Sequence, residues 1–326
     1  MAFNIELIGN GAVGALLGGL FSMQGHEVAF RGGKSRPRGA TVGTLRILLP
    51  AFWLSAAGSR FLAAEEETQP DTVIIALGWQ HLHALRRLDF QRITRTPRAS
   101  LIFLNSDPAE ASRLCAPERR ASFGLTLMNA VKLQANEVEL ATVNPVLIIE
   151  KRAGLEGLFA DLRTFGFRIL AVDDIAPFAD SFLLSRLLSV AVAMCNTTIG
   201  NFLSFPEGRE LAVHMLEEGL LAMERTGRQL ARLPLADPKE LLGIIIKKPE
   251  VFERVRAQPD RCYNSVLQSF LRGKPSEAPL LMRRIVELAS EAGVHPTWNW
   301  RVLQKCGRIP AVGFYRNPAE LLRSLD

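Results

Sequence analysis

The sequence predicts an α/β protein of two domains, in which a doubly wound, largely parallel sheet precedes an all-α domain. At 326 residues the chain is too long for one typical core. Across residues 1–174, short apolar runs of strand length alternate with helical patterns, as in a sheet covered by helices on both faces. Across residues 175–326, amphipathic helical stretches dominate and prolines mark their boundaries.

The first 30 residues predict a strand at 4–9, a helix at 12–24 and a second strand at 26–30, with a glycine turn between the first strand and the helix. The turn "GNGAVG" has G-x-G-x-x-G spacing and consists of Gly9, Asn10, Gly11, Ala12, Val13 and Gly14. A dinucleotide pyrophosphate binds free backbone N–H groups at such a helix N-terminus. We expect Gly9 to permit the tight turn, Gly11 the close approach of the ligand, and Gly14 the packing of helix on strand. The alternative is a glycine turn required by sterics alone.

Similar patterns predict the remaining elements. Further strands are expected at 45–49 and 52–54, as a hairpin around Pro50, and at 71–77, 99–105, 123–131, 143–150 and 167–172. Helices are expected at 79–88, 154–165, 182–199, 208–231, 238–247, 262–272 and 277–292. The first half therefore reads as a Rossmann-type domain and the second as a helical domain.

The formal net charge of +6 is partly concentrated after the second strand. There "AFRGGKSRPR" has no carboxylate to hold a ribose 2′-hydroxyl, but supplies Arg31, Lys34, Arg36 and Arg38. A cluster of cations at this position suits the 2′-phosphate of NADP. We therefore expect NADPH to be preferred over NADH, with Arg31 and Lys34 as its ligands. The alternative is a solvated basic loop.

Several other classes of function are not expected. The four cysteines are scattered without metal spacing, and His81 and His83 do not share a helix face, so no metal site is predicted. The remaining arginines are dispersed, with few aromatic residues between them, which disfavours nucleic-acid binding. No signal peptide or membrane span is recognised, so we expect a cytoplasmic protein.

Over essentially its full length the chain resembles the ketopantoate reductase family. The resemblance is carried by "LIGNGAVGALLGGLFSMQGHEVAF", "DTVIIALGWQ", "FLN" at 103–105, "VDDIAPFADSFLLSRLLSVAVAMCNTTIGNF" and "NSVLQSFLRGKPSEAPLL". It implies an NADP-binding Rossmann domain over 1–174. It also implies a helical substrate and dimerisation domain over 175–326, similar to the C-terminal domain of 6-phosphogluconate dehydrogenase. The implied reaction is NADPH-dependent reduction of 2-dehydropantoate to pantoate, in pantothenate biosynthesis.

The chain departs from the family at the catalytic lysine. Matching "SRLLSVAVAMCNTTIG" to the family helix places either Arg186 or Leu187 at that lysine, and either Val190 or Ala191 at an Asn one turn later. A second family lysine is replaced by Gly78. Arg186 could polarise a carbonyl, although a guanidinium does not readily give up a proton. The alternative is an exposed or salt-bridged helix residue.

Three other positions agree with the family pattern. Asn105 corresponds to the asparagine on the nicotinamide side, and Ser265 and Glu277 correspond to a substrate-binding serine and glutamate with the same separation. The resemblance implies that Glu277 hydrogen-bonds to the hydroxyl end of the substrate. The alternatives are a surface hydroxyl for Ser265 and, for Glu277, a carboxylate that stabilises a helix dipole.

Three functions remain open from the sequence. The first is an NADPH-dependent oxidoreductase that acts on a small 2-keto acid or a related carbonyl compound. The second is a catalytically inactive NADPH-binding protein that serves as a sensor or assembly partner, and the third is a structural protein without a nucleotide. The apolar helices of the second half would also permit a homodimer.

Overall fold

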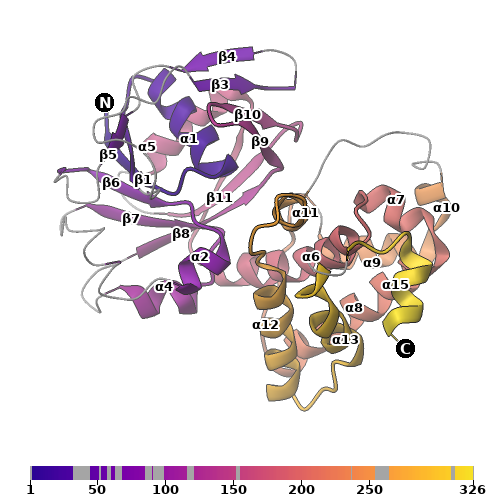
Figure 1. The fold of residues 1–326 in the computed structure, drawn as a ribbon. Helices are drawn as coiled ribbons and strands as arrows, with labels where there is room; N and C mark the ends of the chain where they lie inside the picture. Colours follow the sequence, from indigo (N-terminus) through magenta and orange to yellow (C-terminus); the bar gives the residue numbers. More distant parts are fainter. Residues whose placement is uncertain are drawn as a thin grey trace. The chain divides into compact units, whose positions relative to one another are not determined.

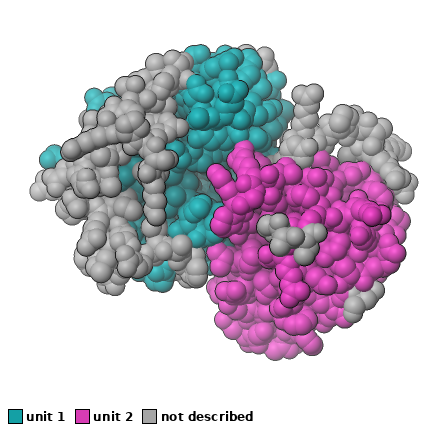
Figure 2. All heavy atoms as spheres, in the orientation of Figure 1, with its two compact units in different colours: residues 1–175 teal, residues 176–326 magenta. Residues whose placement is uncertain are grey.

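In the computed structural model the chain divides into two compact units, Met1–Ile175 and Ala176–Asp326 (Figure 2). The structure describes residues 2–31, 45–50, 53–56, 60–62, 68–84, 90, 99–115, 121–151, 155–235, 237–253, 264–309 and 313–325. The sequence analysis had placed the boundary between residues 174 and 175.

The first unit is built on an eight-stranded sheet with the order β12-β11-β8-β7-β6-β1-β2-β5 (Figure 1). Its strands are β1 (Asn4–Ile8), β2 (Glu27–Arg31), β5 (Arg60–Leu62), β6 (Thr72–Ile75), β7 (Ser100–Leu104), β8 (Ala121–Leu127), β11 (Val146–Glu150) and β12 (Arg168–Val172). All pairs are parallel except β8 with β11. The helical segments are α1 (Ala12–Met23), α2 (Trp79–Ala84), α4 (Pro108–Leu114), α5 (Leu155–Ala160) and the 3-10 turn η1 (Asp161–Phe165).

A second sheet of four strands, which the sequence analysis did not predict as a unit, has the order β4-β3-β10-β9. It contains β3 (Leu45–Leu48), β4 (Trp53–Ala56), β9 (Ala130–Gln134) and β10 (Glu137–Leu140). The hairpin expected around Pro50 is confirmed as β3 and β4. The single strand expected at 123–131 is wrong, because the chain leaves the large sheet after Leu127 and enters the small one at Ala130.

The helix α1 contacts strands of both sheets and lies between them (Figure 1). Its Leu16, Leu17, Leu20 and Phe21 are fully buried in the core of the first unit. A helix covered on two sides needs apolar residues around most of its circumference, which explains the run of small and apolar residues in "AVGALLGGLF". The small sheet therefore fixes α1 from the side opposite the large one.

The second unit is helical, as expected. Its helices are α6 (Ala176–Met194), α7 (Ile199–Ser204), α8 (Pro206–Arg225), α9 (Pro238–Lys247), α10 (Glu250–Glu253), α11 (Ser265–Leu271), α12 (Ala278–Glu291), α13 (Thr297–Cys306) and α15 (Pro318–Leu325). The prediction for α9 is confirmed at both ends. The helices α7, α10, α13 and α15 were not predicted.

The helix expected at 182–199 is wrong at both ends. It begins six residues earlier, because Pro177 is tolerated in the first turn of a helix. It ends at Met194, since Asn196 adopts a left-handed φ of +46° and Thr198 caps the separate helix α7. The helix expected at 208–231 likewise begins at Pro206 and ends at Arg225, two residues before Gly227 with its φ of +68°.

Among the described residues, α6 is the one helix long and apolar enough to cross a membrane by length and composition. However, 56% of its apolar window is buried inside the structure, and it contacts α8, α11 and α12. It also carries Arg186, which is paired with Glu277. These features are those of the central helix of the second unit.

A buried histidine links the end of α1 to η1. The backbone N–H of Phe3 donates to Nδ1 of His26 at 3.1 Å, and the rings of Phe3 and Phe21 lie edge-on against the imidazole. Nε2 of His26 lies 3.6 Å from Oδ2 of Asp161 but has no hydrogen-bond partner among the described residues. Burial lowers the pKa of His26 below its usual value of 6.5, and Asp161 opposes this shift only in part.

Acid is therefore expected to destabilise the first unit through His26. Because the pKa is lower in the folded state, the unfolded chain binds more protons as the pH falls below 6.5, and the free energy of unfolding decreases. His26→Asn keeps an acceptor for Phe3 but cannot be protonated. Denaturant titrations between about pH 8 and about pH 5 should show a smaller loss of stability in this variant than in the wild type. An equal decrease in the free energy of unfolding between these two pH values in both proteins would contradict this role of His26.

Candidate functional site

The glycine turn follows β1 and leads directly into α1. Gly9 has a φ of +107°, and a Cβ there would lie 2.6 Å from the carbonyl oxygen of Ala76. A Cβ on Gly14 would lie 2.1 Å from the carbonyl oxygen of Gly9. At Gly11, by contrast, no described atom lies within 4 Å of the Cβ position. The backbone turn therefore requires Gly9 and Gly14, whereas Gly11 faces open space at the helix N-terminus.

The first turn of α1 has the features of an anion site. Gly11 is the N-cap residue, no side chain caps the helix, and its first turn carries no acidic residue. The first N–H groups of a helix have no intrahelical partner and carry its positive dipole end. The side chains of Ala12 and Val13 pack against the core of the first unit. These residues fit a diphosphate, the group that the sequence analysis expected here.

The carbonyl of Asn10, in the middle of the turn, accepts a hydrogen bond from Nζ of Lys132 on β9 at 2.8 Å. Lys132 is separated from Asn10 by 122 residues and belongs to the small sheet. The sequence analysis did not identify Lys132, because β9 was merged there with β8. The contact between Lys132 and the glycine turn therefore arises only in the tertiary structure.

Arg31, expected to bind a 2′-phosphate, is engaged with a buried carboxylate. Its guanidinium is paired through Nε and Nη2 with Glu6 on β1, and Thr68 donates a hydrogen bond to Oε2 of Glu6 at 2.6 Å. The side chains of Arg31 and Glu6 are 7% and 3% exposed. Arg31 lies opposite Ile8 in the β1–β2 register. Glu6 is two residues before Ile8 on β1, so its side chain points to the same face of the sheet. Lys34, Arg36 and Arg38 lie outside the described residues.

Asn105 is the residue after β7, at the same edge of the sheet as the glycine turn, with β6 between β7 and β1. Its φ is +54°. Its side chain donates to Oγ1 of Thr126 at 2.6 Å and accepts from the N–H of Thr126 at 2.7 Å. The indole of Trp79 donates to its carbonyl oxygen at 2.6 Å. Thr126 and Trp79, which the sequence analysis did not single out, therefore hold Asn105 in place at this edge.

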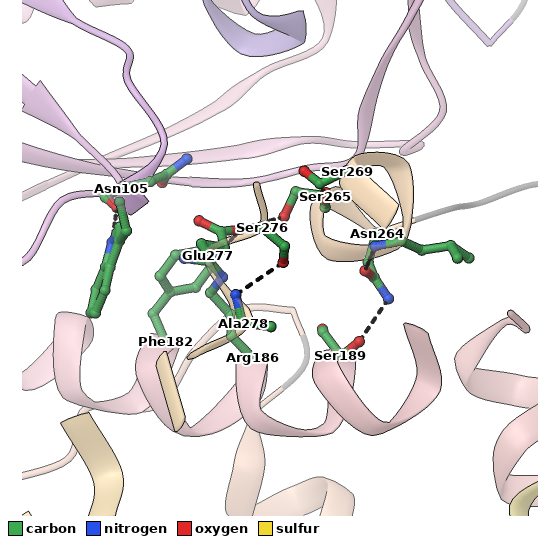
Figure 3. A network of polar contacts seen from close by, with 12 residues as sticks. Asn105, Phe182, Arg186, Ser189, Asn264, Ser265, Ser269, Ser276, Glu277 and Ala278 are labelled. Atoms are coloured by element: carbon green, nitrogen blue, oxygen red, sulfur yellow. Dashed lines mark hydrogen bonds and ion pairs between the residues drawn. The ribbon is translucent and has the colours of Figure 1, made fainter. Parts of the chain in front are cut away.

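A second polar cluster lies within the helical unit (Figure 3). Arg186 on α6 forms an ion pair with Glu277, which precedes α12, and Ser265 at the start of α11 donates to Oε1 of Glu277 at 2.7 Å. The side chains of Arg186 and Glu277 are 12% and 8% exposed. The ring of Phe182, one turn before Arg186, lies 5.3 Å from its Cζ atom. A side chain of α6 and a side chain of α11 thus meet at the carboxylate that precedes α12.

The cluster shows where the two candidates for the family lysine position and the side chain of Glu277 lie. Leu187 is fully buried in the core, whereas Arg186 reaches Glu277. Glu277 makes no capping hydrogen bond, because Ser276 accepts from the N–H of Ala278 at 3.0 Å instead. The carboxylate of Glu277 is therefore turned toward Arg186 and Ser265 rather than toward its own helix.

Asn264 joins this cluster to the central helix. Its Oδ1 accepts from the N–H of Leu267 and caps α11, while its Nδ2 donates to the carbonyl of Ser189 on α6 at 3.1 Å. One side chain thereby fixes the N-terminus of α11, and with it Ser265, relative to α6. Val190 and Ala191, the candidates for the family Asn position, are fully buried, so the cluster has no amide there.

The helical unit contains two buried thiols, Cys195 and Cys306. Burial raises the pKa of Cys195 and of Cys306 to about 12, so both remain neutral thiols at physiological pH. No group of three or more His, Cys, Asp or Glu side chains among the described residues could hold a metal ion.

The chain thus has a Rossmann-like unit followed by a helical unit, an arrangement that is also found in nicotinamide-dependent oxidoreductases. Residues 183–307 match the family described as "Ketopantoate reductase PanE/ApbA C terminal". The helical unit thus carries the C-terminal domain of the ketopantoate reductase family, and the resemblance stated from the sequence is confirmed.

Solved structures agree with this assignment of the fold. A PanE/ApbA family ketopantoate reductase from Ralstonia eutropha JMP134 is 18% identical over 94% of this chain and 98% of its own, with a TM-score of 0.73. A dimeric ketopantoate reductase from Staphylococcus aureus is 16% identical over 94% and 100%, with a TM-score of 0.68. D-mandelate dehydrogenase, with NADH and anilino(oxo)acetate, is 14% identical over 94% and 98%, with a TM-score of 0.74. No curated protein sequence matches the chain significantly.

The glycine turn offers a test that separates folding from ligand binding. Gly14→Ala forces a methyl group against the Gly9 carbonyl and should destabilise the first unit by about 1–3 kcal/mol. Gly11→Ala meets no neighbour and should change stability by less than about 1 kcal/mol, yet weaken coenzyme binding because the methyl group occupies the approach to the backbone. Thermal unfolding and coenzyme titration of both variants test this. Normal coenzyme binding by a folded Gly11→Ala variant would contradict it.

Proposed function

We propose that the protein is an NADPH-dependent oxidoreductase that reduces a small 2-keto acid or a related carbonyl compound. This proposal rests on the N-terminus of α1, which lies at the carboxyl end of the first strand and has no side-chain cap. Its N-cap residue, Gly11, has open space at its Cβ position. A nucleotide diphosphate is the ligand for which this arrangement is known. The family of the helical unit, and a neighbour whose structure contains NADH, support a nicotinamide coenzyme.

The preference for NADPH rests on the sequence after β2. No carboxylate stands among the residues that follow the strand, whereas Lys34, Arg36 and Arg38 are all cations. Arg31 contributes less than its position suggests, because Glu6 already neutralises it in the absence of ligand. The proposed selectivity therefore depends on the basic segment as a whole rather than on Arg31 alone.

The coenzyme would supply a hydride to the carbonyl carbon of the substrate. In the helical unit, Arg186 provides a permanent positive charge that would stabilise the oxygen as negative charge develops on it. Because a guanidinium retains its protons, Arg186 orients and polarises, and the proton for the product comes from water. Ser265 and Glu277 would bind a hydroxyl group of the substrate, and Glu277 would set the direction in which Arg186 points.

A catalytically inactive NADPH-binding protein is the second candidate, and the state of Arg186 favours it. Its guanidinium is already bound to Glu277 and rests on Phe182, in a pair that is nearly buried. A substrate anion would have to displace the Glu277 carboxylate to reach it. A protein that binds the coenzyme but turns nothing over would fit this geometry. The dimeric relative from Staphylococcus aureus supports a homodimer in either case.

A coenzyme titration followed by a turnover assay on the same sample tests both candidates. We expect NADPH to quench tryptophan fluorescence and to bind more tightly than NADH, because the additional phosphate meets the basic segment. A panel of 2-keto acids should then cause NADPH oxidation. Binding without turnover would favour the inactive protein, and failure of both coenzymes to bind or to raise the melting temperature would overturn the proposed function.

The replacement of the family lysine gives a second test. Arg186→Lys restores a group that can transfer a proton and should raise kcat by at least about tenfold, since a proton donor commonly contributes about 10²–10⁴. Arg186→Met removes the charge at similar volume and should lower kcat below that of the wild type. Equal turnover by the two variants would show that position 186 does not act on the substrate.

A further inference from the structure

A continuous row of contacts follows the carboxyl edge of the large sheet, from the glycine turn to β8. Gly9, after β1, packs against Ala76 directly after β6, since a Cβ at Gly9 would lie 2.6 Å from the carbonyl oxygen of Ala76. Three residues later, Nε1 of Trp79 donates to the carbonyl oxygen of Asn105, after β7, at 2.6 Å. Asn105 in turn contacts Thr126 on β8. The row thereby links the ends of four neighbouring strands.

Asn105 is held by its backbone N–H, its backbone carbonyl and its side-chain amide. Its φ of +54° is a left-handed conformation, which residues other than glycine keep only where the surroundings hold them. The N–H donates to the carbonyl of Gly124 at 2.8 Å, the carbonyl accepts from Trp79, and the amide both donates to and accepts from Thr126. The first and third of these contacts tie the residue to β8, whereas the second ties it to the segment after β6.

The direction of a bound dinucleotide follows from the order of the strands. A dinucleotide lies in the crevice outside the carboxyl ends of the strands, with its diphosphate at the glycine turn and its adenosine ribose at the end of the second strand, here β2. Because β2 and β6 flank β1 on opposite sides, the nicotinamide half would extend over the ends of β6 and β7. Trp79 and Asn105 follow these two strands, so their hydrogen bond joins the two segments beneath the nicotinamide half.

We infer that Trp79 is a positioning residue for the nicotinamide half of the coenzyme and that it acts through Asn105, an inference that rests on the proposed function. The side-chain nitrogen of Asn105 has two hydrogens, and Thr126 accepts one of them. The other can donate to the ribose or the carboxamide of the nicotinamide half while the backbone of Asn105 keeps its left-handed conformation. The indole N–H of Trp79 holds that backbone through its carbonyl oxygen.

Ligands with and without a nicotinamide half separate this role from a purely structural one. Trp79→Phe removes the donor and keeps an aromatic ring. We expect it to bind NADPH and NADH about three- to tenfold more weakly, the range that corresponds to one hydrogen bond, because the nicotinamide half loses its support. Adenosine 2′,5′-bisphosphate, which lacks the nicotinamide half, should bind as it does to the wild type. Titration calorimetry measures these affinities independently of tryptophan fluorescence.

A second substitution shows whether Trp79 acts through Asn105. Asn105→Gly removes the amide, and glycine accepts a φ of +54° without strain. It should weaken NADPH binding at least as much as Trp79→Phe does. In the double variant, the change at Trp79 should then reduce the affinity by less than about twofold, because the two residues belong to one chain of contacts. Trp79→Met also lacks the donor, adapts to irregular space and should behave like Trp79→Phe.

Trp53→Phe is the matched control. Trp53 belongs to the same unit, but it lies on β4 of the small sheet and is 45% exposed. The centre of its ring lies 4.6 Å from Cζ of Arg46. The same change from indole to phenyl at this position should leave all of these affinities within about twofold of the wild type.

The outcomes separate this inference from the proposed function. Wild-type affinity for NADPH in a folded Trp79→Phe or Trp79→Met variant would overturn the role of the indole. An equal loss of affinity for NADPH and for the bisphosphate would show that Trp79 only supports the fold, and would overturn the inference as well. Additive losses in the double variant would overturn the action through Asn105. A wild-type protein that binds neither coenzyme overturns the proposed function and this inference with it.

Discussion

The close approach of α1 to the turn before it is the constraint on which the first unit depends. A side chain at Gly14 would collide with the carbonyl of Gly9, and one at Gly18 would collide with the ring of Phe30. On the other side of the helix, a side chain at Gly19 would meet Leu45 and Ile47 of the small sheet. Both sheets therefore hold α1 at the distance that only glycine allows, and this places its N-terminus at the carboxyl edge of the large sheet.

Charged side chains in both units are stabilised by buried partners. Glu6 holds Arg31 in the first unit, and Glu277 holds Arg186 in the second. Removal of one member of such a pair costs about 3–5 kcal/mol, because the other charge is left buried and unpaired. An anionic ligand at either arginine therefore competes with a carboxylate that the fold already supplies. The glycine turn differs, since its donors are the backbone amides at the N-terminus of α1.

The sequence predicted the elements that local patterns determine and missed those that depend on tertiary contacts. Glycine spacing placed the turn and α1 correctly, because steric requirements act over a few residues. The pairing of Glu6 with Arg31 depends on the register of two strands, and the contact of Lys132 depends on a sheet whose strands are far apart in the chain. Leu187 and Arg186 could not be distinguished by alignment, because the direction of a helical side chain follows from packing.

The glycine turn and the helical cluster of Arg186, Ser265 and Glu277 differ in how much they must reorganise to bind an anion. At the glycine turn, the amides of α1 are arranged before any ligand arrives, so little reorganisation opposes binding. At Arg186, the guanidinium must exchange the Glu277 carboxylate for a ligand while Ser265 also loses its acceptor. An uncharged carbonyl oxygen needs no such exchange, because it can lie beside the intact ion pair. The proposed substrate would therefore present a carbonyl or hydroxyl group to the helical cluster, with any carboxylate directed elsewhere.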